Sequence, residues 1–229
     1  MIHDKRQFAA GLVLVGIFLG VLALIFAPIY EGGRNTLDYL DSTFNSISKA
    51  SANFIPAVAK RAGGFDGKPM QVDAKAADAA QAARMVALLG AAGAVTAADG
   101  ARLKVSADVG RMLGAALADA DLMFRNEGAT VAAKYGTEEK RVLYDWHQLL
   151  GSMAKDLTRQ GKFDEAAMLR EVQVKALEPA YNYYGVEAVP MSQMVWVAAA
   201  ALLGYVIYTI WYGFAVMFLF EGWGVKLKH

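Results

Sequence analysis

Two long apolar runs without a charged residue are the strongest constraint on how this chain folds. They cover Gly11–Ala27 near the start of the sequence and Val195–Phe220 near its end. Each is close to the roughly 20 apolar residues that an α-helix needs to cross the hydrocarbon core of a bilayer. We therefore predict two transmembrane helices, near Phe8–Ile29 and Met194–Phe220.

The first run has the basic start of a signal peptide, in Lys5 and Arg6. Its apolar stretch is long for such a peptide, and it lacks a clean small-x-small cleavage site, because Ile25 lies two residues before Ala27 and Pro28 follows. We expect an uncleaved membrane anchor.

Basic residues flank the two runs unevenly, and this predicts the orientation of the chain. Lys5, Arg6, Lys226 and Lys228 lie on the outer sides, whereas Arg34 is the one basic residue within about 15 residues on the middle side. Cytoplasmic flanks are enriched in Lys and Arg, so both termini should be cytoplasmic, at a bacterial inner membrane. The expected domains are 1–30 (first span), 31–192 (periplasmic domain) and 193–229 (second span and tail).

Composition excludes several kinds of protein. The chain has no cysteine, which excludes disulfides, cysteine-ligated zinc and cysteine-ligated iron–sulfur clusters. Residues 31–192 hold 19 of the 23 Lys and Arg and 20 of the 22 Asp and Glu, a net charge of −1. Nucleic-acid binding calls for a clustered basic surface, so we expect no nucleic-acid partner.

The middle of the chain is rich in alanine and lacks alternating β-branched runs, which favours an all-α membrane protein with an outer bundle of four to five helices. The first outer helix should begin at Asn35 or Thr36, and Pro56 should bend or end it. Its apolar seam follows spacings of three and four residues: Leu37, Leu40, Phe44, Ile47, Ser51, Phe54 and Val58. Further helices are expected over Val72–Ala98, Ala101–Asn126, Thr137–Gly161 and Asp164–Leu177.

The other face of the first outer helix carries small polar side chains rather than the Glu, Lys and Arg usual on a solvated face. Small hydroxyl and amide groups lose little rotamer entropy when they are ordered in a contact. We therefore expect this face to bind a partner subunit through Ser42, Asn45, Ser46, Lys49 and Asn53.

The two predicted spans also carry features of helix–helix packing. Gly16 and Gly20 form a GxxxG motif, which lets a second helix approach closely. That second helix is either the other span of this chain or a partner. Near the middle of the second span, four aromatic residues with polar atoms predict contact with another protein, or with a lipid or quinone-like molecule: Tyr205, Tyr208, Trp211 and Tyr212.

No catalytic or cofactor-binding constellation is visible in the sequence. His147 is the one histidine in residues 31–192, whereas a metal or haem site needs several ligands. The serines of Ser42–Ser51 do not lie in a nucleophile elbow, and Gly63–Gly67 lacks the ending of a phosphate-binding loop. We expect no enzyme, no cofactor and no metal.

These features favour a non-catalytic accessory or scaffold subunit of a multi-subunit membrane complex, with integral membrane subunits, or further copies of the chain, and lipid as partners. The alternative is a helical sensor domain that binds a small molecule and signals through a partner, because the predicted cytoplasmic tails are too short for an output domain. Transport ranks last, since no charged residue lies within either apolar run.

Overall fold

The computed structural model describes residues 2–225 and is mostly helical, at 73%. The helical class predicted from the sequence is therefore confirmed. The chain forms two compact units. Unit 1 combines the residues up to Ser48 with those from Ala188 onward, and unit 2 is Lys49–Glu187.

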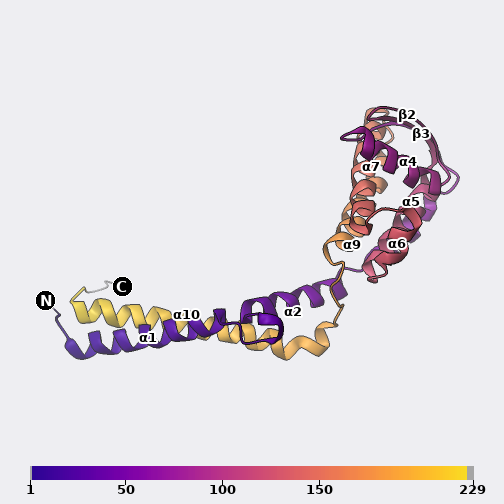
Figure 1. Ribbon diagram of the computed structural model, residues 1–229. Helices are drawn as coiled ribbons and strands as arrows, with labels where there is room; N and C mark the ends of the chain where they lie inside the picture. The colour runs from indigo at the N-terminus through magenta and orange to yellow at the C-terminus, as the bar shows by residue number, and fades with distance from the viewer. Residues whose placement is uncertain (1, 226–229) are drawn as a thin grey trace. The chain divides into compact units, whose positions relative to one another are not determined.

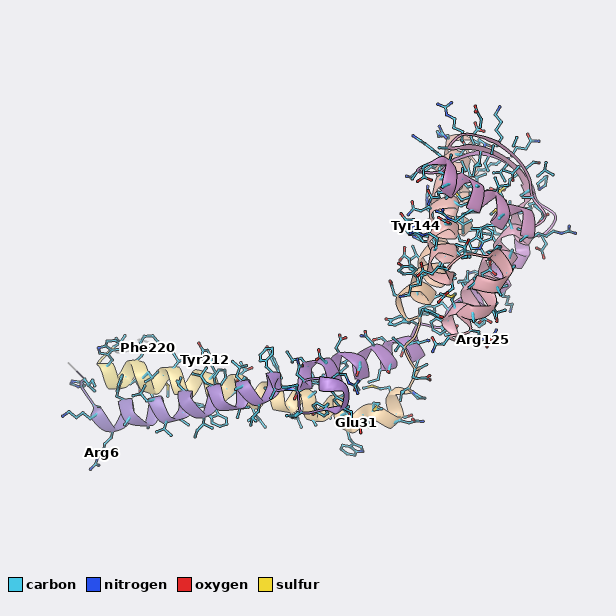
Figure 2. All side chains as sticks on the ribbon, in the orientation of Figure 1. Arg6, Glu31, Arg125, Tyr144, Tyr212 and Phe220 are labelled. Carbon is cyan, nitrogen blue, oxygen red and sulfur yellow. The ribbon has the colours of Figure 1, made fainter. Side chains whose placement is uncertain are left out.

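Unit 1 is built on an antiparallel pair of long helices. Helix α1 (Lys5–Phe26) and helix α10 (Met191–Trp223) lie side by side along the length of α1 (Figure 1). Both are long and apolar enough to cross a membrane, and only 6% of the most apolar stretch of each is buried. Their apolar side chains therefore face outward, unlike those of a helix in a soluble core. Arg6 and Glu31 lie at opposite ends of the pair, with Tyr212 and Phe220 between them (Figure 2).

A tight loop follows α1 and leads into helix α2 (Thr36–Ser51). Gly32 and Gly33 both adopt positive φ angles there, a backbone conformation that glycine reaches without steric cost. The predicted start of the helix at Asn35 is confirmed, because the Asp38 N–H donates to Asn35 Oδ1 at 2.9 Å and the Asn35 N–H donates to Asp38 Oδ2 at 3.0 Å.

The single helix predicted through Val58 is divided in the structure. Helix α2 ends at Ser51, and a separate helix α3 covers Ile55–Ala62. Pro56 lies in the first turn of α3, where its missing N–H would have no intrahelical partner anyway. The proline therefore helps to begin a helix and does not bend one.

Unit 2 contains a three-stranded antiparallel sheet in the order β1-β3-β2. Its strands are β1 (Pro69–Lys75), β2 (Val95–Asp99) and β3 (Arg102–Asp108). Alternate side chains of β1 and β3 are buried, as expected when one face of a sheet covers a core. The buried residues are Met70, Val72, Ala74, Leu103 and Val105.

The helix predictions over Val72–Ala98 and Ala101–Asn126 are therefore wrong where these segments form strands. Only the middle of the first is helical, as α4 (Ala79–Ala91), and only the later part of the second, as α5 (Val109–Phe124). A two-residue turn that starts at Gly100, with φ of 58°, joins β2 to β3. Glycine at the first position of a two-residue loop is a known hairpin signal.

The remaining helices of unit 2 follow in sequence. They are α6 (Gly128–Tyr135), α7 (Glu139–Arg159), α8 (Phe163–Val172), a π-helical segment (Gln173–Leu177) and α9 (Glu178–Asn182). Helix α7 corresponds to the helix predicted over Thr137–Gly161, whereas the short α6 was not predicted.

Helix α7 covers the outer edge of β1. Its side chains at four-residue spacing bond to the backbone of that strand: Ser152 Oγ accepts from the Lys75 N–H at 2.8 Å and Asp156 Oδ2 from the Asp73 N–H at 2.9 Å. Gln160 Nε2 donates to the Gln71 carbonyl at 2.9 Å. An uncovered edge strand is a template for aggregation, and these bonds saturate it.

Two buried carboxylates tie α7 to its neighbours. Asp119 is fully buried and accepts hydrogen bonds from Trp146 Nε1 (2.9 Å), the Tyr135 hydroxyl (2.6 Å) and Lys134 Nζ (2.8 Å). Burial of Tyr135 and its hydrogen bond to Asp119 raise the pKa of the hydroxyl well above its usual range, which keeps it protonated as a donor. Each donor fixes α6 or α7 to α5.

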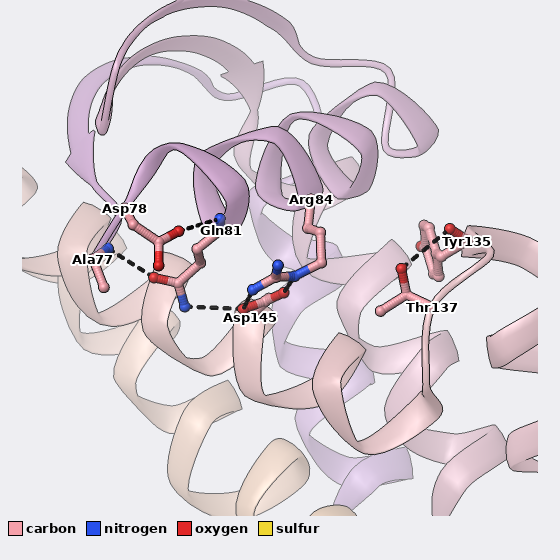
Figure 3. A network of polar contacts seen from close by, with 7 residues as sticks. All are labelled: Ala77, Asp78, Gln81, Arg84, Tyr135, Thr137 and Asp145. Atoms are coloured by element: carbon pink, nitrogen blue, oxygen red, sulfur yellow. Dashed lines mark hydrogen bonds and ion pairs between the residues drawn. The ribbon is translucent and has the colours of Figure 1, made fainter.

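The second carboxylate, Asp145, holds α4 against α7 (Figure 3). Arg84 Nε donates to Asp145 Oδ2 at 2.6 Å, and Gln81 Nε2 donates to Asp145 Oδ1 at 2.9 Å. Asp78 caps the start of α4 by accepting from the Gln81 N–H. Since Asp145 is only 1% exposed, its charge depends on these donors.

Where the chain enters and leaves unit 2, a single polar cluster holds both ends together. Lys49 is 2% exposed, and its Nζ donates to Asn126 Oδ1 (2.9 Å) and to the Val186 carbonyl (2.7 Å). Asn126 Oδ1 also accepts from the Gly185 N–H at 2.8 Å. We call Lys49, Asn126, Gly185 and Val186 the neck cluster.

Replacing Asn126 tests the neck cluster. Asn126 has a φ of 64°, so Asn126→Gly removes only its hydrogen bonds and should lower the free energy of unfolding by about 1–3 kcal/mol. Asn126→Ala should cost about 1 kcal/mol more, because alanine is strained at positive φ. Urea unfolding in detergent, followed by helical circular dichroism, measures both. Two variants as stable as the wild type would contradict the role of the cluster.

The ion pairs of Glu171 make the stability of unit 2 depend on pH. Glu171 accepts from Lys175 Nζ (2.8 Å) and Arg61 Nη2 (2.7 Å), and these bonds hold its pKa below the usual range. A carboxylate whose pKa is lowered on folding stabilises the folded state at pH values above its unfolded-state pKa of about 4.3. This stabilisation is lost as the pH falls through the lower, folded-state pKa.

Glu171→Gln should therefore lower the free energy of unfolding at pH 7, by up to about 1 kcal/mol because the pair is partly exposed. The difference from the wild type should shrink as pH falls below about 4.3. Urea unfolding at pH 7 and pH 3 measures it, with Glu165→Gln on the same helix as control. A difference that stays constant with pH would disprove the electrostatic origin.

Candidate interaction surfaces

Two glycines that the sequence motifs did not indicate form the tight packing between α1 and α10. A Cβ added to Gly11 would lie 2.8 Å from the backbone nitrogen of Leu219. A Cβ added to Gly222 would lie 2.5 Å from the backbone nitrogen of Phe8. The two helix backbones therefore approach closely because these two positions lack a side chain.

Aromatic contacts continue this interface toward the other end of α1. The rings of Phe18 and Tyr208 stack with centroids 4.2 Å apart, and the Tyr212 ring lies 5.0 Å from that of Phe18. The Tyr208 hydroxyl donates to the Phe18 carbonyl at 3.0 Å. Of the four predicted aromatic contact residues, Tyr208 and Tyr212 thus contact the other long helix of this chain.

The GxxxG motif faces away from this interface. Added Cβ atoms on Gly16 and Gly20 would meet no atom within 4 Å. Gly20 lies nine residues beyond Gly11, which is two and a half turns at 3.6 residues per turn and therefore the opposite side of the helix. Two other glycines of α10, Gly204 and Gly213, are equally open.

The other two aromatic contact residues are not satisfied within the described part of the chain. Tyr205 is 70% exposed. Trp211 Nε1 is buried and has no hydrogen-bond partner among residues 2–225. Indole N–H groups removed from water usually find an acceptor, so this atom lacks its normal partner.

Part of the apolar seam of helix α2 is exposed, while Leu40 and Ile47 of the same seam are half-buried. The apolar residues Leu37 and Phe44 are 46% and 41% exposed, whereas Ser42, Asn45 and Ser46 are half-buried. The Ser42 and Ser46 hydroxyls donate to backbone carbonyls of their own helix, at 2.8 and 2.9 Å.

Two residues of the predicted polar face lie toward the end of α2. Lys49 is buried in the neck cluster, so it does not lie on an exposed face as predicted. Asn53 is exposed in the short connection between α2 and α3. The predicted polar surface is therefore not one continuous exposed face.

The residues weighed for catalysis or metal binding are separate in space or already bonded. His147 Nε2 lies 3.1 Å from Glu178 Oε1, on the surface between α7 and α9. Within residues 2–225, no three His, Cys, Asp or Glu side chains gather as a metal site would require. The hydroxyls of Ser42 and Ser46 are bonded to backbone and face no base.

Comparisons with protein families, with curated proteins and with solved structures find no match for this chain. Its interaction surfaces must therefore be argued from their own geometry.

The glycine placement predicts which substitutions disturb the helix pair. Gly11→Leu should separate α1 from α10, since overpacking costs about 1–3 kcal/mol, whereas Gly16→Leu should not. Cysteines replacing Gln7 and Glu221, whose side-chain ends lie 3.4 Å apart, report the pairing through a short bis-maleimide cross-linker. The chain has no other cysteine. Equal cross-linking yields in the two leucine variants would show that Gly11 does not position the pair.

Proposed function

We propose that this protein is a non-catalytic accessory subunit of a membrane protein complex, in which α1 and α10 cross the bilayer as one hairpin. The observation that carries the proposal is that some glycines of the two long helices are packed against the other helix and others are not. Gly11 and Gly222 join the hairpin, while Gly16 and Gly20 remain open on the opposite side. The GxxxG motif is thus not explained by packing within the chain.

An open GxxxG face suits a partner helix for a physical reason. Lipid tails are as apolar as leucine, so helices associate in a bilayer mainly through close packing, which small residues permit. The Tyr205 side chain on α10, which is exposed, supports the same proposal. No water is present at mid-bilayer to satisfy its hydroxyl, whereas a partner's carbonyl or side chain would.

The first outer helix offers a second contact, which we assign to its apolar face. Leu37 and Phe44 are exposed on α2, and burial against a partner would remove their surface from water. The polar residues Ser42 and Ser46 are half-buried, and their hydroxyl protons are used in hydrogen bonds within the helix, so they are less available for contact with a partner.

The proposed topology has both termini in the cytoplasm and unit 2 on the outside of a bacterial inner membrane. The hairpin brings the start of α1 and the end of α10 together, since the His3 and Asp4 N–H groups donate to the Gly222 carbonyl at 2.9 and 3.0 Å. Lys5 and Arg6 lie at this end, and Lys and Arg are enriched on the cytoplasmic side.

Assembly in native membranes tests the proposal. The tagged wild-type chain, extracted in mild detergent, should co-purify with integral membrane proteins or with further copies of itself, as native mass measurement shows. Gly16→Leu combined with Gly20→Leu should reduce the co-purifying protein at least about tenfold, because leucines keep a partner backbone away.

Ala10→Leu is the control, because it also adds a branched apolar side chain at an exposed position of α1. It should leave assembly intact, and the cross-link between positions 7 and 221 should form in all three chains. A wild-type chain that purifies as a lone monomer would contradict the proposal. So would full assembly of the double glycine variant.

A further inference from the structure

A groove of about 710 Å³ lies on unit 2 between α7 and the helices that follow it. Its α7 wall includes His147, Ser152 and Lys155, and its other wall includes Arg170 from α8 and Gln173 from the π-helical segment. The volume is within the range of small-molecule sites, about 300–1,000 Å³.

The groove is strongly biased toward positive charge. Lys75, Lys155 and Arg170 line it, against the single carboxylate of Glu178. That carboxylate already contacts His147 Nε2 at 3.1 Å. Within residues 2–225, neither the Lys75 nor the Lys155 ammonium group has an ion-pair partner, although the chain as a whole has nearly equal numbers of acids and bases.

One wall of the groove is an irregular helix. Within the π-helical segment, Gln173 is 9% exposed, and its Nε2 donates to the His147 carbonyl at 2.7 Å. A Cβ on Gly151 would lie 2.8 Å from the same nitrogen, so glycine at 151 makes room for the amide. Such π-helical insertions often occur at functional sites.

The opposite rim is fixed by the sheet. The Lys75 N–H donates to Ser152 Oγ at 2.8 Å, which anchors the end of β1 against α7 and places Lys75 beside the groove. The side-chain hydroxyl of Ser152 remains able to donate its own proton. The groove thus combines ammonium, guanidinium and hydroxyl donors from three elements.

We propose that this groove binds a small molecule carrying a phosphate group. A phosphate offers several oxygens and up to two negative charges, which suits donors spread over three elements. Hydrogen bonds between ionised partners are roughly twice as strong as neutral ones. Arg170 Nη2 donates to Thr158 Oγ1 at 2.8 Å, and the other N–H groups of its guanidinium remain for a phosphate. The site goes beyond the proposed role in assembly and does not depend on it.

Phosphate binding is tested on the full-length chain in nanodiscs of neutral phosphatidylcholine. Isothermal titration with pyrophosphate should show saturable binding. Lys75→Gln combined with Lys155→Gln should weaken it at least about tenfold, because both ammonium groups would donate charge-assisted hydrogen bonds to the phosphate. Lys60→Gln with Lys104→Gln removes the same charge outside the groove and should leave the affinity unchanged.

A second arm separates a soluble ligand from a lipid headgroup. The same chains are titrated with short-chain phosphatidic acid below its micellar concentration. Binding of pyrophosphate that needs Lys75 and Lys155 supports a soluble phosphate compound. Binding of phosphatidic acid alone, with the same lysine dependence, supports a headgroup.

The proposal is overturned if neither compound binds, or if the control pair of substitutions weakens binding as much as the groove pair. Thermal unfolding of all three chains shows whether unit 2 keeps its fold. Because this assay needs no partner subunit, its outcome is independent of whether the chain assembles into a complex.

Discussion

Unit 2 is inserted into the chain between α2 and α10, so its two ends must lie close together. The neck cluster meets this constraint with one ammonium group. Lys49 binds two neutral oxygens and lies 5.2 Å from the centre of the Phe124 ring, while burial lowers its pKa. A charge held by neutral acceptors depends on their placement, and Asn126 supplies one of them from a left-handed backbone position. Closure of unit 2 therefore relies on the bonds of Lys49 to Asn126 and to the Val186 carbonyl.

Sequence patterns predicted the parts of the structure in which local signals agree. The charge-free runs became α1 and α10, and the amphipathic stretch after Thr137 became α7. The sheet was missed because its strands are short and rich in alanine, which favours helices locally. The alternation of Met70, Val72 and Ala74 and the turn at Gly100 were weaker signals than the overall composition.

Contacts between distant residues were harder to predict. GxxxG is a local motif, whereas the pairing of Gly11 with Leu219 depends on the register of two helices far apart in sequence. The seam of α2 was found by its period, but a period does not say which face is covered, and Leu37 and Phe44 are exposed. The basic groove joins residues of β1, α7 and α8 and leaves no local pattern.

The proposed functions use the two units differently. In unit 1, one side of α1 joins the hairpin and the other side is left for a partner, so assembly does not compete with the fold of the chain. In unit 2, the carboxylates of Asp119 and Asp145 are enclosed by their own donors, and the ammonium groups of Lys75 and Lys155 are left for the proposed ligand. An accessory subunit of this kind would bring a phosphate-responsive element to its complex.

The pairing of Gly11 with Leu219 also sets an order of events during biosynthesis. The two residues are about 200 positions apart, which corresponds to ~10–40 s at translation rates of about 5–20 residues per second. Every residue of the neck cluster is made before α10 begins. Unit 2, which ends at Glu187, is therefore synthesised while α1 still lacks its intramolecular neighbour. During this interval the open side of α1 is already complete, so a partner helix is able to bind the nascent chain before the hairpin closes.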